Sequence, residues 1–134
     1  MKKDINPPKV NDVAFAVVKE KNKEGETVWN VYVINLRETT MHTVLISATG
    51  YGEVDGSKKK TTTLRYFLGD VEPNKAVLVE PIMADVFSLH NEYWLTFYHD
   101  RVLHDKKFIF LAESIKDEHL TPIPVLNKKG ILIK

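Results

Sequence analysis

The chain has 134 residues, the length of one ordinary domain, and 43% of them are hydrophobic and 28% charged. This balance is typical of a folded globular protein and excludes a disordered or fibrous one. Its 19 basic and 18 acidic residues give a net charge of +1, so no long-range field attracts nucleic acid or an anionic membrane. The absence of cysteine excludes disulfides and thiolate chemistry and fits a reducing compartment.

The N-terminal residues 1–8 carry two lysines and two prolines but no apolar stretch with a cleavage site. We therefore expect no signal peptide. Apolar runs elsewhere are far shorter than the ~20 residues that a membrane-spanning helix needs. The sequence thus predicts a cytoplasmic protein without a membrane partner.

Two strands are predicted near the N-terminus, over residues 13–18 and 28–36, because both segments are rich in β-branched and aromatic residues. A turn at Glu24-Gly25 would join them. With these two residues as the loop, Val17 opposes Tyr32 and Phe15 opposes Ile34. The second strand is apolar on both faces, which predicts a central position in its sheet.

Residues 41–49 form the next predicted strand, which runs towards Asp55-Gly56, a strong hairpin signal. Pairing across this turn aligns Leu45 with Tyr66. The fourth strand then has an inward face made of Leu64, Tyr66 and Leu68.

The second half of the chain contains three further strands, over residues 76–80, 93–99 and 103–111. Pro81 is expected to end the first of them, because proline cannot donate to a β-ladder. A helical turn within residues 83–91 would cross between sheets. Asp100-Arg101 lies at the tip of the last hairpin.

This pattern predicts an all-β fold, an antiparallel two-sheet sandwich of about seven strands of the immunoglobulin or fibronectin type III kind. A small barrel is the competing architecture. Residues 1–112 would form the sandwich domain and 113–134 a C-terminal extension with a helical turn near 113–119. Its apolar Ile131-Leu132-Ile133 is expected to dock as an edge strand, on its own sheet or on a partner's.

One group of side chains at the last hairpin has the chemistry of a metal site. With a four-residue loop, His99 and His104 face each other, and Asp100 and Asp105 could complete a set of ligands that zinc accepts. The same residue types are ordinary at a solvated turn, and we favour that interpretation. The sequence therefore assigns no metal ligand and no cofactor.

Other catalytic patterns are missing from the sequence. No serine lies in a Gly-x-Ser-x-Gly frame, and the glycines at 50, 52 and 56 lack the Gly-Lys-Ser/Thr ending of a phosphate loop. A glycosidase needs two carboxylates on either side of a cleft. Glu80, Asp85 and Glu92 could supply such a pair, but most domains contain carboxylates of this kind. Lys58-Lys59-Lys60 lacks interleaved stacking aromatics, so we do not expect nucleic-acid binding.

The remaining signal is an excess of large apolar residues, namely Trp29, Phe67, Trp94 and Tyr98, together with the apolar tail. Our leading hypothesis is a non-enzymatic interaction or structural module that binds a protein partner, including another copy of itself. The alternative is a small metal-dependent or carboxylate-based enzyme with its site near the His99/His104 hairpin or in a loop cleft.

Three segments carry a resemblance to a known family: residues 29–35 (Trp-Asn-Val-Tyr-Val-Ile-Asn), residues 91–97 (Asn-Glu-Tyr followed by Thr-Phe) and residues 107–110 (Lys-Phe-Ile-Phe). Over about residues 1–112 the chain resembles a small bacterial family of uncharacterised all-β proteins. Members of that family are sometimes labelled phenylalanyl-tRNA synthetase alpha subunit. The sequence lacks the adenylate-binding sheet and phosphate-binding arginines of such an enzyme, and the resemblance carries over no functional residues.

Overall fold

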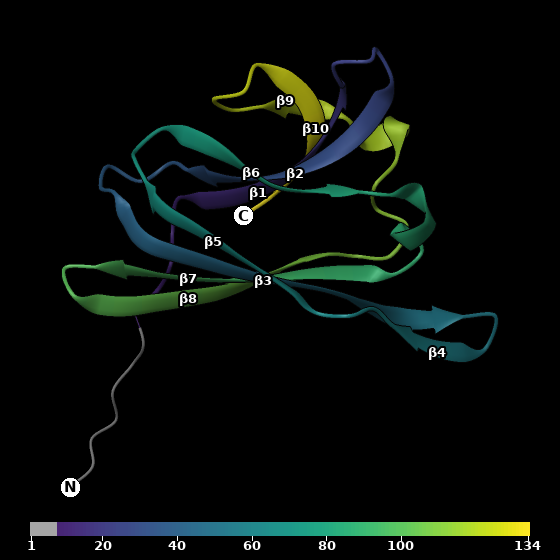
Figure 1. Cartoon of the computed structure of the whole chain (residues 1–134), viewed down its shortest axis with the longest axis horizontal. Coiled ribbons are helices and arrows are strands. Elements are labelled where there is room, and N and C mark those ends of the chain that lie inside the picture. The colour runs from purple at the N-terminus through teal and green to yellow at the C-terminus, as the bar shows by residue number, and fades with distance from the viewer. Residues whose placement is uncertain (1–7) are drawn as a thin grey trace, which may run out of the picture.

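A computed structural model of the chain describes residues 8–134 and shows an all-β protein (Figure 1). Residues 1–7, where no signal peptide is expected, lie outside the described part. The strands are β1 (Val13–Lys21), β2 (Thr27–Asn35), β3 (Met41–Val54), β4 (Ser57–Lys60), β5 (Leu64–Val71), β6 (Lys75–Ile82), β7 (His90–His99), β8 (Val102–Phe110), β9 (Thr121–Ile123) and β10 (Lys128–Ile133). Two short 3-10 helices, η1 (Ala84–Val86) and η2 (Asp117–His119), lie in connections where helical turns were predicted.

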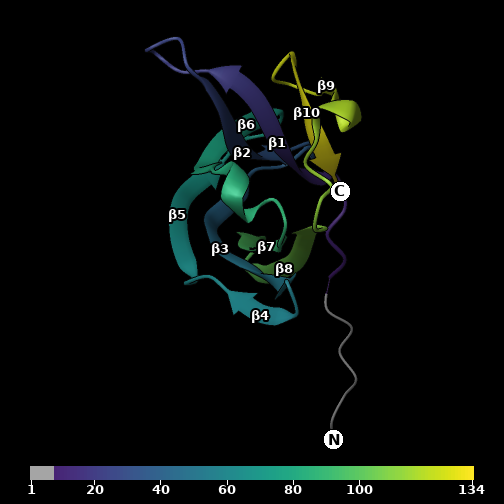
Figure 2. The ribbon, with the colours of Figure 1, turned by 90° about the vertical axis from the view of Figure 1, so that its right-hand side faces the viewer.

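The strands form two antiparallel five-stranded sheets, so the predicted sandwich is confirmed (Figures 1 and 2). Sheet A has the order β6-β2-β1-β10-β9. Sheet B has the order β4-β3-β7-β8, with β5 pairing on β3 beside β4. The described residues form ten strands rather than about seven: β4 and β9 were not predicted, and β10 was predicted only as a docking tail outside the seven.

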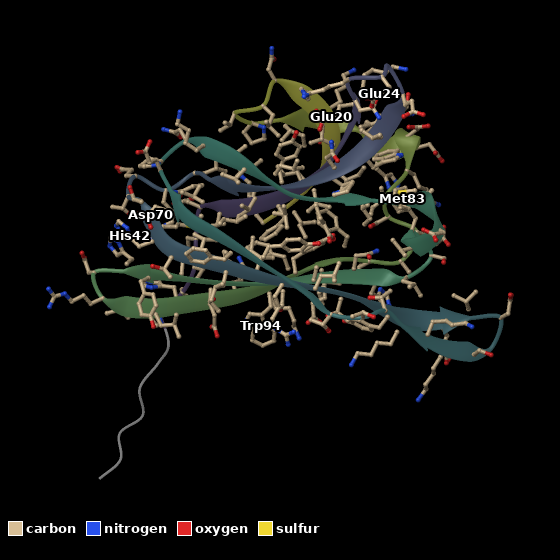
Figure 3. The ribbon with its side chains drawn as sticks, in the orientation of Figure 1. Glu20, Glu24, His42, Asp70, Met83 and Trp94 are labelled. Atoms are coloured by element: carbon tan, nitrogen blue, oxygen red, sulfur yellow. The ribbon has the colours of Figure 1, made fainter. Side chains whose placement is uncertain are left out.

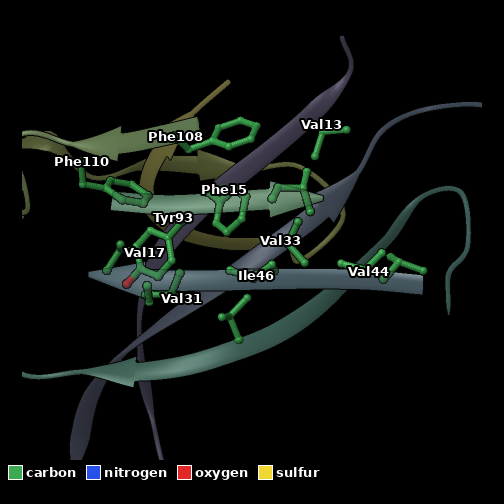
Figure 4. Close-up of a cluster of buried hydrophobic side chains, with 14 of the residues drawn as sticks. Val13, Phe15, Val17, Val31, Val33, Val44, Ile46, Tyr93, Phe108 and Phe110 are labelled. Carbon is green, nitrogen blue, oxygen red and sulfur yellow. The ribbon is translucent and has the colours of Figure 1, made fainter. Parts of the chain in front are cut away.

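A dry interior lies between the sheets (Figure 4). Alternate residues of β1, starting with Val13, Phe15 and Val17, face the inner side of sheet B. Phe15 has no exposed surface, and its ring centroid lies 5.4 Å from that of Tyr93 and 4.7 Å from that of Phe108. The aromatic rings of the two sheets therefore interlock at the centre of the protein.

The outer face of sheet A has its own, smaller core. Ala14, Ala16 and Val18 on the other side of β1 are fully buried, and they pack with Ile34 and Ile123. Side chains of the β9–β10 hairpin cover this face: Ile123, Leu126 and Leu132 pack in the cluster, and β10 pairs with β1. The apolar tail thus docks on its own sheet, but as an interior strand and not at the edge.

The register predicted for the first hairpin was wrong by one residue. The strands extend to Lys21 and Thr27, and a five-residue loop centred on Glu24 joins them. Within it, the Asn22 side-chain oxygen accepts hydrogen bonds from the amides of Glu24 and Glu26. Val17 therefore opposes Val31, and Tyr32 lies on the outer face and not in the main core.

The Asp55-Gly56 turn forms as predicted, but it joins β3 to β4. Residues 61–63 interrupt the ladder before β5 begins, and this interruption shifts the pairing by one residue, so that Leu45 opposes Phe67. Leu64, predicted to face inward, is 49% exposed. Tyr66 and Leu68 pack against the core as predicted.

Pro81 does not end its strand, contrary to the prediction. It lies inside β6 opposite Asn30. Because β6 is the edge of sheet A, the missing amide hydrogen of proline leaves no gap in the ladder.

Among residues 8–134 there is no helix with the length and apolar character to cross a membrane.

The contact between β1 and β10 predicts a sharp effect of one substitution. A Cβ atom at Gly130 would lie 2.3 Å from the carbonyl oxygen of Val17, a backbone atom that cannot move aside. We expect Gly130→Ala to lower the free energy of unfolding by about 2 kcal/mol or more, and Lys129→Ala, at an exposed position, to change it little. Urea unfolding of both variants measures this, and equal stabilities would contradict the packing of β10 on β1.

Candidate functional site

A cleft of about 370 Å³ lies at the end of the sandwich where β6 leads into η1. We call it the Glu80 cleft. Residues of β3, β5, β6, β7 and η1, and of the connections after β4 and β6, line it: Ala48, Thr49, Gly50, Thr61, Thr62, Leu64, Glu80, Pro81, Ile82, Met83, Asp85, Val86 and Asn91. This volume is within the range of small-molecule sites.

A β-bulge in β6 directs Glu80 towards the interior. Tyr32 opposes Leu78, but its neighbour Val31 opposes Glu80, so Val79 is an extra residue in the ladder. A bulge lets two consecutive side chains point to the same side of a sheet. Val79 accordingly belongs to the main core, and the Glu80 carboxylate reaches the hydroxyls of Tyr66 and Tyr93 beneath sheet A.

Glu80 accepts a hydrogen bond at each carboxylate oxygen. The Tyr66 hydroxyl donates to Oε1 at 2.5 Å, and the Tyr93 hydroxyl donates to Oε2 at 2.7 Å. Burial, followed by the hydrogen bond to Glu80, raises the pKa of Tyr66 to about 12. Burial, followed by the charge of Glu80, raises the pKa of Tyr93 well above its ordinary range. Both phenols therefore remain hydrogen-bond donors at neutral pH.

These pKa shifts predict a loss of stability in alkali. A phenol whose pKa is higher in the folded state stabilises the fold fully below its ordinary pKa of 10, and this contribution disappears as the pH rises through the folded value of about 12. We expect the free energy of unfolding to fall above pH 10 and to fall less steeply in Tyr66→Phe. Urea unfolding across this pH range, with tyrosinate absorbance, measures both. Identical slopes in the two proteins would refute the Tyr66–Glu80 bond.

Asn91 forms a second fixed polar group of the cleft. Its side-chain nitrogen donates to the carbonyl oxygens of Val86 and Leu89, at 3.0 and 3.1 Å, and it is only 6% exposed. These bonds fix the amide so that its oxygen faces Gly50. A Cβ on Gly50 would lie 3.3 Å from that oxygen and 3.1 Å from Thr61 Cγ2, so glycine keeps this side of the cleft open.

The outer face of sheet B carries a second candidate site. Five large side chains that are 41–66% exposed lie on neighbouring strands: Leu45, Phe67, Trp94, Tyr98 and Leu103. The ladders place Leu45 opposite Phe67 and Tyr98 opposite Leu103. Figure 3 shows Trp94 pointing away from the sandwich. We call these five residues the outer apolar patch.

Cationic side chains surround this patch. Lys107 opposes Trp94, and its Nζ lies 5.6 Å from the Trp94 ring centroid, while Arg65 opposes Ser47 in the same row. Arg101 lies beside Tyr98 at the hairpin tip. None of these three cations forms an ion pair within residues 8–134.

Acidic residues also lie near the patch. Asp70 lies 3.2 Å from the His42 imidazole, a pair labelled in Figure 3, and Asp100 lies 3.2 Å from that of His99; each imidazole is charged only when protonated. Asp105, opposite Thr96, and Glu92, two residues before Trp94 on β7, are further acids next to the patch. Charges of both signs therefore surround the patch, and the cations Arg65 and Lys107 lie in the row of Trp94.

The histidine pair predicted at the last hairpin does not face across it. The loop has two residues, not four, because Asp100 and Arg101 both adopt positive φ angles, and His99 therefore opposes Val102 while His104 opposes Phe97. The two imidazoles are diagonal neighbours with centroids 6.0 Å apart. His104 Nδ1 lies 2.9 Å from the Val102 carbonyl oxygen, and its ring stacks on Phe97.

The expected carboxylate ligands do not join the imidazoles in one site. Asp100 contacts His99 alone, and Asp105 lies in the Thr96 row. In the described part of the chain no group of three His, Cys, Asp or Glu side chains could hold a metal ion.

The three carboxylates proposed for a cleft are divided between two places. Glu80 and Asp85 line the Glu80 cleft together. Glu92 lies near the outer face, where the Tyr51 hydroxyl donates to it at 3.3 Å. Lys58, Lys59 and Lys60 form β4, an exposed edge strand.

The chain matches no model of a known protein family, and a search of curated proteins finds no match to it. The resemblance to a small bacterial all-β family therefore stays a prediction.

Proposed function

We propose that the protein is a non-enzymatic interaction module that binds an acidic protein partner through the outer apolar patch of sheet B. One observation carries this proposal: residues 8–134 cover the outer face of one sheet and leave that of the other exposed. The apolar outer face of sheet A lies under the β9–β10 hairpin, whereas Phe67, at 66% exposed, and its neighbours on sheet B have no such cover within residues 8–134. Exposed apolar patches of this kind are typical of protein-binding surfaces.

Side-chain chemistry supports a protein ligand for this patch. Trp and Tyr are enriched at the energetic centres of protein interfaces, and Trp94 and Tyr98 lie on the same strand, two of the largest side chains in the patch. The strands beneath them belong to the rigid sandwich, so the patch needs little ordering before it binds. A flat, preformed surface of this kind suits another folded protein or an extended segment.

The unpaired cations in and beside the row of Trp94 support acidic groups in the partner. Arg65, Arg101 and Lys107 can each form an ion pair with a carboxylate of the partner, and such pairs select the partner and speed association. A second copy of this chain fits less well, because it would bring the same three cations with the same patch.

A selection with displayed peptides tests the proposal. From a library in which apolar residues alternate with randomised charged ones, we expect the enriched peptides to combine Asp or Glu with Leu, Phe or Trp. Phe67→Glu and Lys107→Glu should each weaken binding of such a peptide at least about tenfold, because they add repulsion to an apolar or cationic contact. Val125→Glu, at an exposed apolar position on the β9–β10 turn, is the matched control.

Four results would overturn the proposal. Enriched peptides without acidic residues would contradict an acidic partner. Equal loss of binding in Val125→Glu would contradict the assignment of binding to the outer apolar patch. A dimer in light scattering that Phe67→Glu dissociates would show that a second copy occupies the patch. Tight binding of a single-stranded oligonucleotide that Trp94→Ala abolishes would assign the patch to nucleic acid instead.

A further inference from the structure

We propose that the Glu80 cleft binds a small organic cation, a primary ammonium compound with a short apolar chain. This site lies at the end of the sandwich and is separate from the outer apolar patch. Its lining includes the carboxylates of Glu80 and Asp85 and no lysine, arginine or histidine. Lys59 and Lys60 line the neighbouring cleft that shares Asp85 with this one. Within the Glu80 cleft itself the two carboxylates have no cation beside them in the lining, which favours a positively charged ligand over a neutral or anionic one.

The Glu80 carboxylate is built into the site and is not a mobile surface group. The bulge at Val79 aims it inward, and the hydroxyls of Tyr66 and Tyr93 hold both oxygens. Tyr93 itself is 1% exposed and packs on Phe15, so this support does not move. Each carboxylate oxygen can accept more than one hydrogen bond, and the remaining acceptor positions of Glu80 serve the cleft.

Asn91 adds a neutral acceptor to the two charges. The side chain is more than nine-tenths buried, and both of its donor hydrogen bonds go to backbone carbonyls. Its side-chain oxygen accepts no hydrogen bond from residues 8–134, so it is free to accept one from a molecule in the cleft. An ammonium group carries three donors, and Glu80, Asp85 and Asn91 all line the cleft as acceptors.

The rest of the lining defines the uncharged part of the ligand. Ile82, Val86 and Leu64 provide apolar wall, and Met83, which is 70% exposed, forms the rim (Figure 3). A chain of a few methylene groups can contact these side chains while its ammonium end lies at the carboxylates. The volume of about 370 Å³ limits the ligand to a small molecule.

Calorimetric titration at low ionic strength tests the charge preference directly. The probe is n-butylammonium chloride, and the matched ligands of the same chain length are sodium butyrate and 1-butanol. We expect binding of butylammonium at least about tenfold tighter than of either matched ligand, and weakening by added salt. Butyrate or butanol binding as tightly as butylammonium would overturn the proposal, and so would no detectable binding of butylammonium.

Variants locate the bound cation. Asp85→Asn changes an exposed side chain and should leave the fold intact while it weakens butylammonium binding about tenfold. Glu80→Gln should weaken it at least as much, and circular dichroism checks that this variant still folds. The control is Glu53→Gln, an exposed carboxylate on β3 outside the lining of the cleft.

The outcome for Asp85→Asn decides the proposal even where Glu80→Gln is unstable. Unchanged binding in Asp85→Asn, or equal loss in Glu53→Gln, would place the cation elsewhere. Phe67→Glu should bind butylammonium as the unmodified protein does, because the outer apolar patch is a different surface. Failure of the peptide experiment and failure of this one are therefore distinguishable.

Discussion

The packing of Phe15 between Tyr93 and Phe108 is the contact on which the rest of the structure depends. Phe15 belongs to the central part of sheet A and the other two rings to sheet B, so their stacked and tilted contacts join the layers. Tyr93 also contacts Phe110 edge to face and donates to Glu80. One ring therefore serves the hydrophobic core and the polar end of the sandwich at once, and the position of Glu80 follows from that of the core.

The two sheets differ in what covers their outer faces. Sheet A has small residues there, Ala14 and Ala16, which let the C-terminal hairpin approach closely, and Gly130 lies against the backbone of β1. Sheet B has bulky residues outside, among them Trp94 and Phe67, and no segment of residues 8–134 packs over them. The size of the outward side chains thus divides the molecule into a self-covered face and a face available to other molecules.

Much of the strand pattern could be predicted, because alternation is a local property. Tyr66 and Leu68 were expected on an inward face and pack against the main core. The register could not be predicted, because it depends on loop lengths that similar turn residues allow: five residues around Glu24 and two at Asp100-Arg101. Each error of one or two residues moved side chains to other faces or partners, including Tyr32 and the His99/His104 pair.

The Glu80 cleft was harder to predict for a different reason. A β-bulge has no reliable sequence pattern, and without it Glu80 would be expected to point outward, opposite to Val79. Pro81 was a usable hint, since proline within a strand marks an edge or a bulge. Tyr66 was another, because an inward tyrosine needs an acceptor for its hydroxyl. Bringing Asn91 and Asp85 to the same cleft required the crossing of η1 between the sheets, which is a tertiary property.

The pairing of β1 with β10 has a consequence for how the molecule is made. These strands come from opposite ends of the described chain. All the residues between them must be synthesised before β1, already paired with β2, can pair with β10. Until then one edge of a buried strand stays open to pairing with other chains. A chain that lacks β10 therefore exposes an unpaired edge of a buried strand and is prone to aggregate.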